Sequence, residues 1–391
     1  MESIDDIITS ESTRRAYFPV AEDTIYLSHA GVCILPRVAG DALREYATRG
    51  ERNNQETPEA LAMVDDARAN AAALIGSQAL EVAMLGPTSL GLSLVANGLD
   101  WQAGDEVIAY ADDYPANVYP WKNLESRGVK YVGLQPDMPG VITWALVEAA
   151  ITPNTRLVAL ASCHFLSGYR IDIDTIGRNL RERGILFCLD AIQTVGAFPT
   201  SVEHVDFLSA DSHKWMLGPA AAGIFYVRKS LQKQLNPSLL GAWNVMSRDF
   251  VAQDDIRFYV GARRYEPGML NLPGIVSMNA SMKLILRLGV DAIAARLLEL
   301  REAILERLRP LGYSLYLDDL DQACPSDVSW KSAIVSVTHP TKDLGALYAA
   351  LGEQGVVVSY RKNRAGTKFI RLSPHFYNTI EELDRVAELM R

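Results

Sequence analysis

The chain has 391 residues, of which 49% are apolar and 22% charged, a composition typical of globular proteins. Its 38 basic and 47 acidic residues give a net charge of −9, which argues against nucleic acid or an anionic membrane as the main partner. The N-terminus is unlike a signal peptide, and no apolar run is long enough to cross a membrane. We therefore expect a cytoplasmic protein with no nucleic-acid partner and no membrane partner. The four cysteines lack metal-ligand spacing, so no metal site is expected.

Short apolar runs alternate with amphipathic stretches through the first two-thirds of the chain. The runs lack polar alternation, which is typical of strands buried on both faces. Strands are predicted at Val82–Leu85, Glu106–Tyr110, Val129–Leu134, Arg156–Ser162, Ile185–Leu189, Phe207–Ala210 and Gly223–Val227. Helices are predicted at Ser89–Gly98, Ala116–Arg127, Ala145–Ala150 and Ile173–Arg183. This alternation predicts an α/β domain with a mostly parallel sheet of seven strands and helices on both faces.

The rest of the chain changes character. Residues 231–274 have the composition of long active-site loops. A long helical stretch follows at about Ile275–Leu308, with a break near Gly289. Further strands are predicted at Ala333–Val337, Val356–Tyr360 and Lys368–Leu372, with helices near Lys342–Gln354 and from Ile380. We therefore expect an N-terminal arm (1–20), a large domain (21–265) and a small α+β C-terminal domain (266–391).

The segment around residues 188–220 carries the strongest chemical signal. Asp190 ends one predicted strand, and Asp211, Ser212, His213 and Lys214 follow the next. Ligands of open α/β sheets bind at the carboxyl ends of the strands. Burial and neighbouring charges can lower the pKa of a lysine until it is a nucleophilic amine. A Schiff-base lysine and an aspartate for a pyridinium nitrogen are what pyridoxal 5′-phosphate (PLP) requires. The alternative is a surface lysine and a helix-capping aspartate.

These residues form the pattern Asp-Ala-x-Gln, then Asp-Phe-x-x-x-Asp-Ser-His-Lys-Trp-x-x-Gly-Pro. The pattern resembles the class V aminotransferase family of fold-type I PLP enzymes, which includes cysteine desulfurases, selenocysteine lyase and isopenicillin-N-epimerase-like proteins. The resemblance runs from Ile25-Tyr-Leu-Ser-His-Ala-Gly to Ile370-Arg-Leu-Ser-Pro-His-Phe-Tyr-Asn-Thr. It implies a PLP cofactor, and a homodimer with its active site at the subunit interface.

The resemblance assigns cofactor contacts residue by residue. Lys214 is expected to form the Schiff base, Asp190 to hold the pyridine nitrogen, and Gln193 to contact the phenolic oxygen. Thr88 and Ser89 begin a helix whose free N–H groups suit the phosphate, although an ordinary helix cap is the alternative. Tyr114 is expected to stack on the ring, or else to pack on Pro115. The remaining expected cofactor contacts are Asp211, Ser212, His213 and Met269, of which Met269 replaces a threonine that in the family reaches the neighbouring subunit's phosphate.

The resemblance also implies substrate contacts. Arg371 resembles the family arginine that forks onto the substrate α-carboxylate, with a solvated edge arginine as the alternative. His29 and Gly31 are expected on the substrate side, although His29 could equally be a structural loop histidine. Arg361 and Arg364 are either contacts for a second substrate anion or solvated loop charges.

Two departures from the family pattern bear on the reaction. Desulfurases carry a nucleophilic cysteine just before the carboxylate arginine, whereas Ser359–Lys368 contains none, so a persulfide-forming desulfurase is disfavoured. Phe165 replaces an asparagine that contacts the phenolic oxygen, which leaves that contact to Gln193 and lets His164 approach the ring. Lys214, Asp190 and Tyr114 are the candidate catalytic residues. Transamination of an amino acid is our nominal prediction, with C–S lysis, epimerisation and an inactive PLP-fold binding protein left open.

Overall fold

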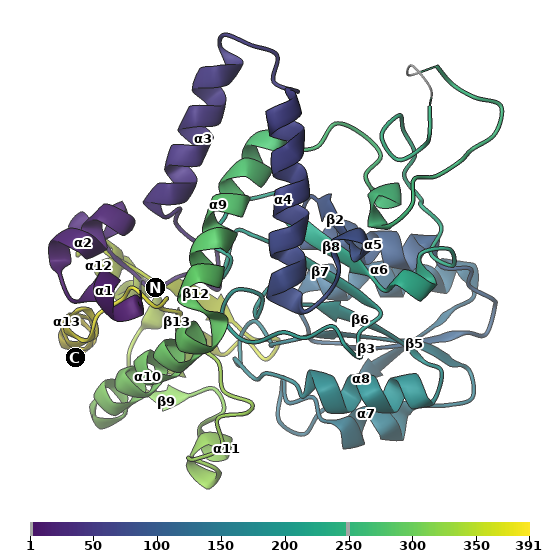
Figure 1. The fold of residues 1–391 in the computed structure, drawn as a ribbon. Coiled ribbons are helices and arrows are strands. Elements are labelled where there is room, and N and C mark those ends of the chain that lie inside the picture. Colours follow the sequence, from purple (N-terminus) through teal and green to yellow (C-terminus); the bar gives the residue numbers. More distant parts are fainter. Residues whose placement is uncertain (1–2, 248–250) are drawn as a thin grey trace.

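The larger part of the molecule is built on a seven-stranded sheet. The computed structural model describes residues 3–247 and 251–391 (Figure 1). The strand order is β2-β8-β7-β6-β5-β3-β4. Only β8 runs antiparallel to its neighbours in this sheet, so the predicted mostly parallel arrangement is confirmed. The strands are β2 (Val82–Leu85), β3 (Glu106–Tyr110), β4 (Lys130–Leu134), β5 (Thr155–Ala161), β6 (Leu186–Asp190), β7 (Phe207–Asp211) and β8 (Gly223–Val227).

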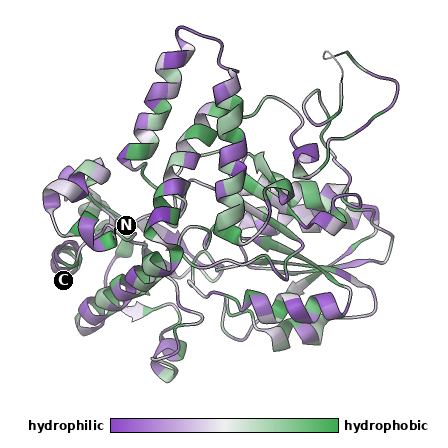
Figure 2. Ribbon diagram, in the orientation of Figure 1, coloured by the Kyte–Doolittle hydropathy of each residue, from purple (hydrophilic) through white to green (hydrophobic). Residues whose placement is uncertain are grey.

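Helices cover both faces of this sheet, which explains why its strands are apolar without alternation. Along β3, Val107 packs in the core beneath α5 (Thr88–Gly98) and α6 (Tyr119–Lys122), whereas Ile108 belongs to the core on the other face. That second core is closed by α4 (Pro58–Ile75), α7 (Trp144–Ala150), α8 (Ile173–Glu182) and α9 (Leu272–Leu288). The central strands are accordingly drawn in the green of apolar residues in Figure 2.

The last third of the chain forms a smaller sheet with its own apolar core. The strand order is β12-β13-β10-β9, and all neighbours are antiparallel. The strands are β9 (Ser314–Leu315), β10 (Val335–Thr338), β12 (Ser359–Lys362) and β13 (Lys368–Leu372). The accompanying helices are α10 (Val290–Leu308), α11 (Asp318–Ala323), α12 (Leu344–Glu353) and α13 (Ile380–Leu389). The predicted break in the long helical stretch is confirmed at Gly289, which lies at φ +86° between α9 and α10.

The N-terminal segment packs against the C-terminal part of the chain, where Arg14 pairs with Glu382. The helices α1 (Ile4–Ile8) and α2 (Glu11–Tyr17) lead into β1 (Ile25–Tyr26), which pairs in parallel with β11 (Val356–Val357). A single strand predicted over Val356–Tyr360 is therefore wrong, because β11 and β12 join different sheets.

Two other regions differ from the prediction. The predicted helix at Ala116–Arg127 is divided into η3 (Pro115–Asn117), α6 and η4 (Asn123–Arg127). Pro120 lies inside that stretch and has no N–H to donate, so a continuous helix is not favoured there. The long hairpin of α3 (Arg37–Gly50) and α4, which packs on α9, is not among the predicted helices.

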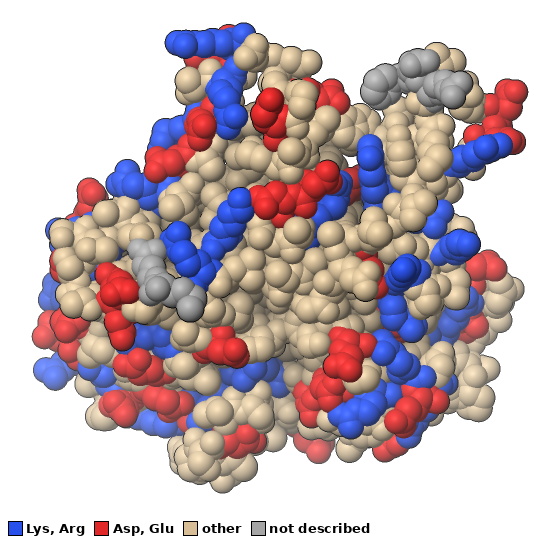
Figure 3. Space-filling view, viewed as in Figure 1, with Lys and Arg blue, Asp and Glu red and all other residues tan. Residues whose placement is uncertain are grey.

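Basic and acidic side chains are interspersed on the face of the molecule shown in Figure 3. Across residues 3–247 and 251–391, no helix is long and apolar enough to span a membrane. The same residues contain no group of three histidine, cysteine or carboxylate side chains placed to bind a metal ion.

Candidate active site

An open cavity of about 920 Å³ lies where the large sheet meets the small one. The carboxyl ends of β6 and β7 bring Asp190 and Lys214 to its wall, and the turn from β2 into α5 adds Thr88. β12 and β13 of the small sheet contribute Arg361 and Arg371 from the opposite side. Residues that are far apart in the sequence therefore converge at the strand edge where α/β proteins bind ligands.

Lys214 is a buried amine without a partner. Its residue is 7% exposed, and its Nζ makes no hydrogen bond or ion pair with any residue in 3–247 or 251–391. Burial lowers the pKa of Lys214 to about 8, although the charge of Asp190 acts in the opposite direction. Leu217 and Ala221, just after Lys214, have positive φ values of 55° and 60°, a backbone strain typical of functional sites. The site therefore holds a lysine that readily becomes a neutral nucleophile.

Asp190 is the matching buried carboxylate. One of its oxygens accepts the Ile192 amide at 3.1 Å, and the residue is 3% exposed. Burial raises the pKa of Asp190 to about 6, opposed by that amide and by the charge of Lys214. A buried carboxylate of this kind is stabilised by a cationic ligand group that lies against it.

A second buried carboxylate, Asp113, is not among the predicted site residues. Its oxygens accept the Tyr114 amide at 2.7 Å and the Asn117 side-chain amide at 3.1 Å. Burial, and then the charge of Asp190, raises the pKa of Asp113 to about 7. Asp113 therefore fixes the backbone of the loop that carries Tyr114. Because Asp113 directly precedes the predicted site residue Tyr114, the sequence alone could have indicated that Asp113 lies near the site.

The start of α5 forms an anion-binding corner of the cavity. The N-cap residue, Pro87, has no side-chain hydrogen bond to the first turn of the helix. The first N–H groups of α5 are therefore open to a ligand. Thr88 is buried and its hydroxyl oxygen accepts the Asp211 amide at 2.9 Å, while Ser89 is exposed at the cavity. His213 lines the same corner, with Nδ1 3.1 Å from a carboxylate oxygen of Asp211. Asp211 thus positions Thr88 and His213 without lining the cavity itself.

Two aromatic rings form a wall beside Lys214. The ring centroid of Tyr114 lies 5.5 Å from Nζ of Lys214 and 5.6 Å from the ring of Phe165, which it meets edge-on. Tyr114 is 49% exposed and lines the cavity, so its face is available for a planar ligand.

Arg371 is a buried cation held only by neutral groups. It is 2% exposed, and it donates to the carbonyl oxygen of Phe165 at 2.6 Å and to the Ser359 hydroxyl at 3.4 Å. Its Nε has no partner among the described residues. Burial, and then the charge of Arg361, lowers the pKa of Arg371 to about 9. A guanidinium with spare N–H groups and no carboxylate is poised to bind an anionic ligand.

Several predicted site residues lie behind the cavity wall instead of lining it. Gly31 lines the cavity, but His29 is fully buried, with Nδ1 3.0 Å from the Ser373 carbonyl and Nε2 3.2 Å from the Tyr377 hydroxyl. His29 therefore does not line this cavity, because its ring packs in a buried cluster with Tyr26, His375 and Tyr377. Ser212 is also fully buried, and its hydroxyl donates to the Pro219 carbonyl at 2.8 Å.

Gln193 and His164 have most of their hydrogen-bonding groups engaged. Gln193 accepts from the Trp215 indole at 2.8 Å and donates to the Ala30 carbonyl at 3.2 Å, which leaves one amide hydrogen. His164 is 6% exposed, its Nδ1 accepts the Ser167 amide at 3.1 Å, and burial lowers its pKa to about 4. His164 therefore stabilises the backbone of its own loop and does not line the cavity.

Met269 lies outside the cavity of its own chain and is 58% exposed.

The residues present fit PLP. The unpartnered amine of Lys214, the buried Asp190, the open helix N-terminus at Thr88 and the exposed face of Tyr114 match a carbonyl, a pyridinium nitrogen, a phosphate and a ring. A family model described as Aminotransferase class-V matches residues 25–386, so the chain belongs to this family. It is therefore a PLP-dependent enzyme of fold type I, as the sequence pattern predicts.

Three similar proteins are named for chemistry on cysteine or cystine. A probable cysteine desulfurase of Methanothermobacter thermautotrophicus is 26% identical over 404 residues, covering 97% of each chain. The apo structure of a cysteine desulfurase from Thermococcus onnurineus NA1 matches with a TM-score of 0.88 at 23% identity, covering 100% of this chain and 98% of that one. The cystine C–S lyase C-DES, in complex with cysteine persulfide, matches with a TM-score of 0.85 at 20% identity, covering 95% and 98%. Both structures share the fold of this chain.

Lys214→Ala should abolish covalent attachment of PLP. Without the amine, borohydride treatment of the protein with PLP should leave no cofactor mass on the peptide around residue 214. Turnover should fall by at least about 10²-fold, the usual contribution of one proton-transfer group. Mass spectrometry of the reduced peptide and a turnover assay measure the two effects.

Lys229→Ala is a matched control, because Lys229 is exposed and lies outside the cavity. It should retain the cofactor mass and the turnover of the unsubstituted protein. Turnover that survives in Lys214→Ala would show that the assignment of Lys214 is wrong.

Proposed function

We propose that the protein is a PLP-dependent C–S lyase that acts on a cysteine- or cystine-type amino acid. The observation that carries this proposal is the convergence of Lys214, Arg371 and Arg361 on a cavity with no thiol among its described lining residues. Relatives named for chemistry at the C–S bond of cysteine or cystine support the same substrate class. Lysis at this bond releases a sulfur product directly from the substrate and needs no protein thiol to receive the sulfur.

PLP, when bound, supplies an electron sink that stabilises negative charge at the Cα atom of an amino acid. Arg371 binds the α-carboxylate and fixes the orientation of the Cα–H bond. Lys214 removes the proton from Cα at its Nζ, for which a pKa near 8 is well suited. Tyr114 bounds the space beside Nζ and can donate its phenolic proton to a departing sulfur. Asp190 holds the pyridine nitrogen, and Thr88, Ser89 and His213 hold the phosphate.

The positions of the four thiols argue against a persulfide on the protein. β12 and β13 are joined by the short turn 363–367, which contains no cysteine. Cys33 donates to the Gly218 carbonyl at 3.3 Å, and burial raises its pKa to about 12. Burial also raises the pKa of Cys163 to about 11 and that of Cys188 well above its usual range. Cys324 is exposed at the end of α11, outside the cavity.

The second arginine favours a substrate with two anionic groups. Arg361 lines the cavity and donates to the neighbouring Tyr360 carbonyl at 3.0 Å. No described carboxylate pairs with it, and its charge lowers the pKa of both Arg371 and Lys214. Arg364, by contrast, pairs with Asp112 at 3.0 Å. Cystine carries two carboxylates and matches the two cavity arginines, whereas cysteine carries one.

Transamination is the second candidate, because Lys214 alone can remove the Cα proton and return one elsewhere. His29 and His164 are buried in other contacts, so neither is placed to protonate a leaving group in the cavity. The two reactions differ in their need for an acceptor. Lysis proceeds without a keto acid, and transamination requires one.

The PLP-loaded protein should convert cystine to pyruvate, ammonia and cysteine persulfide without an added keto acid. Water supplies the oxygen of pyruvate, so no further reactant is needed. Mass spectrometry of the products measures this reaction. If the keto acid of cystine forms only when an acceptor such as 2-oxoglutarate is added, with glutamate as the second product, lysis is contradicted and transamination is favoured.

Arg361→Met tests the substrate class within the same assay. It should raise the KM for cystine about tenfold, the effect of losing one charge-assisted hydrogen bond, and leave the KM for cysteine nearly unchanged. Arg364→Met is the matched control, because Arg364 is bound to Asp112. An equal change for cystine and cysteine would show that Arg361 does not bind a second anion.

We further propose a homodimer in which residues 261–271 approach the partner's cofactor. In this chain Leu240, Met246, Val260 and Met269 are exposed apolar side chains on the segment that leads into α9. Exposed apolar residues that are concentrated on one segment are typical of a surface that another subunit covers. Sedimentation of the PLP-loaded protein should give twice the mass of the chain, and a monomer would contradict the proposal.

A further inference from the structure

We propose that Arg170 is a positioning residue for the substrate carboxylate, acting with Ser332 and Ser336. Together they fix the loop 165–170, whose Phe165 carbonyl holds Arg371. This inference rests on the proposed function, since it takes the α-carboxylate of an amino acid to bind at Arg371. According to this inference, residues outside the cavity also determine the affinity of the protein for its amino-acid substrate.

The Phe165 carbonyl is the strongest constraint on the Arg371 guanidinium. It accepts from one terminal nitrogen at 2.6 Å, whereas the Ser359 hydroxyl lies at 3.4 Å from the other. A carbonyl directs the guanidinium without neutralising its charge, so the remaining N–H groups stay available. Any shift of the loop would turn the guanidinium away from its ligand.

Two serine side chains of the small domain hold the loop by donating to the loop's backbone carbonyl groups. The Ser336 hydroxyl donates to the Leu166 carbonyl at 2.6 Å, and the Ser332 hydroxyl donates to the Gly168 carbonyl at 2.7 Å. Ser336 on β10 is directly paired with Arg371 on β13. A Cβ at Gly168 would lie 2.5 Å from the Ile334 carbonyl oxygen, so the loop approaches the small domain as closely as a glycine allows.

Arg170 forms the reciprocal contact from the loop. Its Nε donates to the Lys331 carbonyl at 2.5 Å and its terminal nitrogen to the Val328 carbonyl at 2.9 Å. Its backbone N–H donates to the Trp330 carbonyl at 2.7 Å, and its guanidinium carbon lies 4.3 Å from the Phe198 ring centroid. The side chain therefore fastens the end of the loop to residues 328–331.

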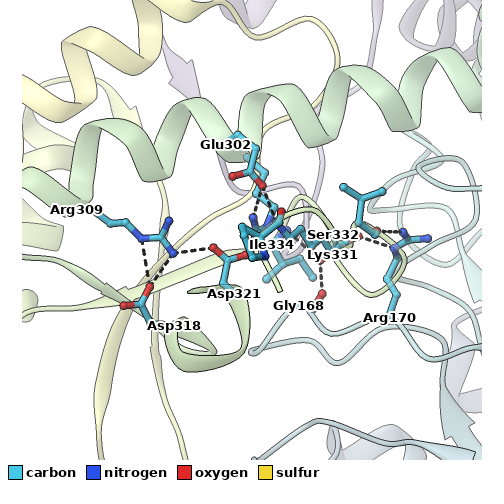
Figure 4. A network of polar contacts seen from close by, with 12 residues as sticks. Gly168, Arg170, Glu302, Arg309, Asp318, Asp321, Lys331, Ser332 and Ile334 are labelled. Atoms are coloured by element: carbon cyan, nitrogen blue, oxygen red, sulfur yellow. Dashed lines mark hydrogen bonds and ion pairs between the residues drawn. The ribbon is translucent and has the colours of Figure 1, made fainter. Parts of the chain in front are cut away.

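The segment that receives Arg170 is itself anchored by buried charges (Figure 4). Lys331 is 1% exposed, and its Nζ donates to the Pro325 carbonyl at 2.7 Å and lies 3.3 Å from Asp321. Asp321 also pairs with Arg301 and Arg309, each at 2.6 Å. Breaking a buried network of this kind is costly, so the segment is a rigid base for the loop.

Arg170→Met should weaken binding of ligands that have a carboxylate and spare those that lack one. In the PLP-loaded protein, titration with L-alanine and with L-alaninamide, followed by the visible absorbance of the cofactor, gives the two dissociation constants. We expect about a tenfold increase for alanine, the effect of one misplaced charge-assisted hydrogen bond, and little change for alaninamide. Arg170→Lys should restore part of the difference, because a lysine can still donate to one carbonyl.

Ser336→Ala provides a second variant that removes only a hydroxyl and should change the alanine-to-alaninamide ratio in the same direction. Arg178→Met and Ser230→Ala are the matched controls, since both side chains are exposed and lie outside the loop and the segment that holds it. Equal weakening of both ligands, or no change in Arg170→Met and Ser336→Ala, would overturn the positioning role. Absence of alanine binding by the unsubstituted protein would instead contradict the proposed function.

Discussion

The structure depends on three buried charges that the chain leaves uncompensated. Lys214, Asp190 and Arg371 are each 7% exposed or less, and none of them forms a direct ion pair with another described residue. Removing isolated charges from water is unfavourable, so burial lowers the pKa of the two cations and raises that of the carboxylate. Such an arrangement is maintained where a ligand supplies the missing partners. For the proposed function these are a carbonyl for Lys214, a pyridinium nitrogen for Asp190 and a carboxylate for Arg371.

The two sheets are therefore interdependent. Lys214 and Asp190 come from the carboxyl edge of the large sheet, whereas Arg371 comes from β13 of the small one. Arg371 is held by a carbonyl of the large-domain loop, and that loop is held by Ser332 and Ser336 of the small domain. The position of the Arg371 guanidinium therefore depends on this contact between the domains. In the proposed function, hydrogen bonds outside the cavity thus affect substrate binding.

Local patterns in the sequence were sufficient for most of the fold. The predicted bounds of β2, β3, β8 and β13 agree with the structure residue for residue. For β2 and β8 the reason is a short run without charged residues, which leaves few alternatives. The positions of Asp190 and Lys214 after neighbouring strands predicted that they share a site, and the family resemblance added Arg371; all three line one cavity. The hairpin of α3 and α4 was not predicted, because α4 is rich in alanine and has no clear apolar stripe.

Side-chain directions could not be predicted in the same way. His29 and Ser212 lie in motif positions, yet both side chains are buried outside the cavity. His29 is hydrogen-bonded to the Tyr377 hydroxyl, and Ser212 donates to the Pro219 carbonyl. Arg170 and Ser336 carry no motif, because their partners are backbone carbonyls far away in the chain. Long-range contacts to the backbone leave no trace in residue identity, and only the folded structure reveals them.

The central claim is tested most directly by the titration of Lys214 in the cofactor-free protein. Burial favours the neutral amine, so Lys214 should become reactive as the pH rises through about 8 rather than through the usual value of 10.5. Labelling with trace acetic anhydride across this pH range, with the peptide around residue 214 quantified by mass spectrometry, gives the midpoint. A midpoint near pH 8 is the predicted result. A midpoint near pH 10.5 would show that Lys214 is an ordinary solvated lysine and would contradict the account.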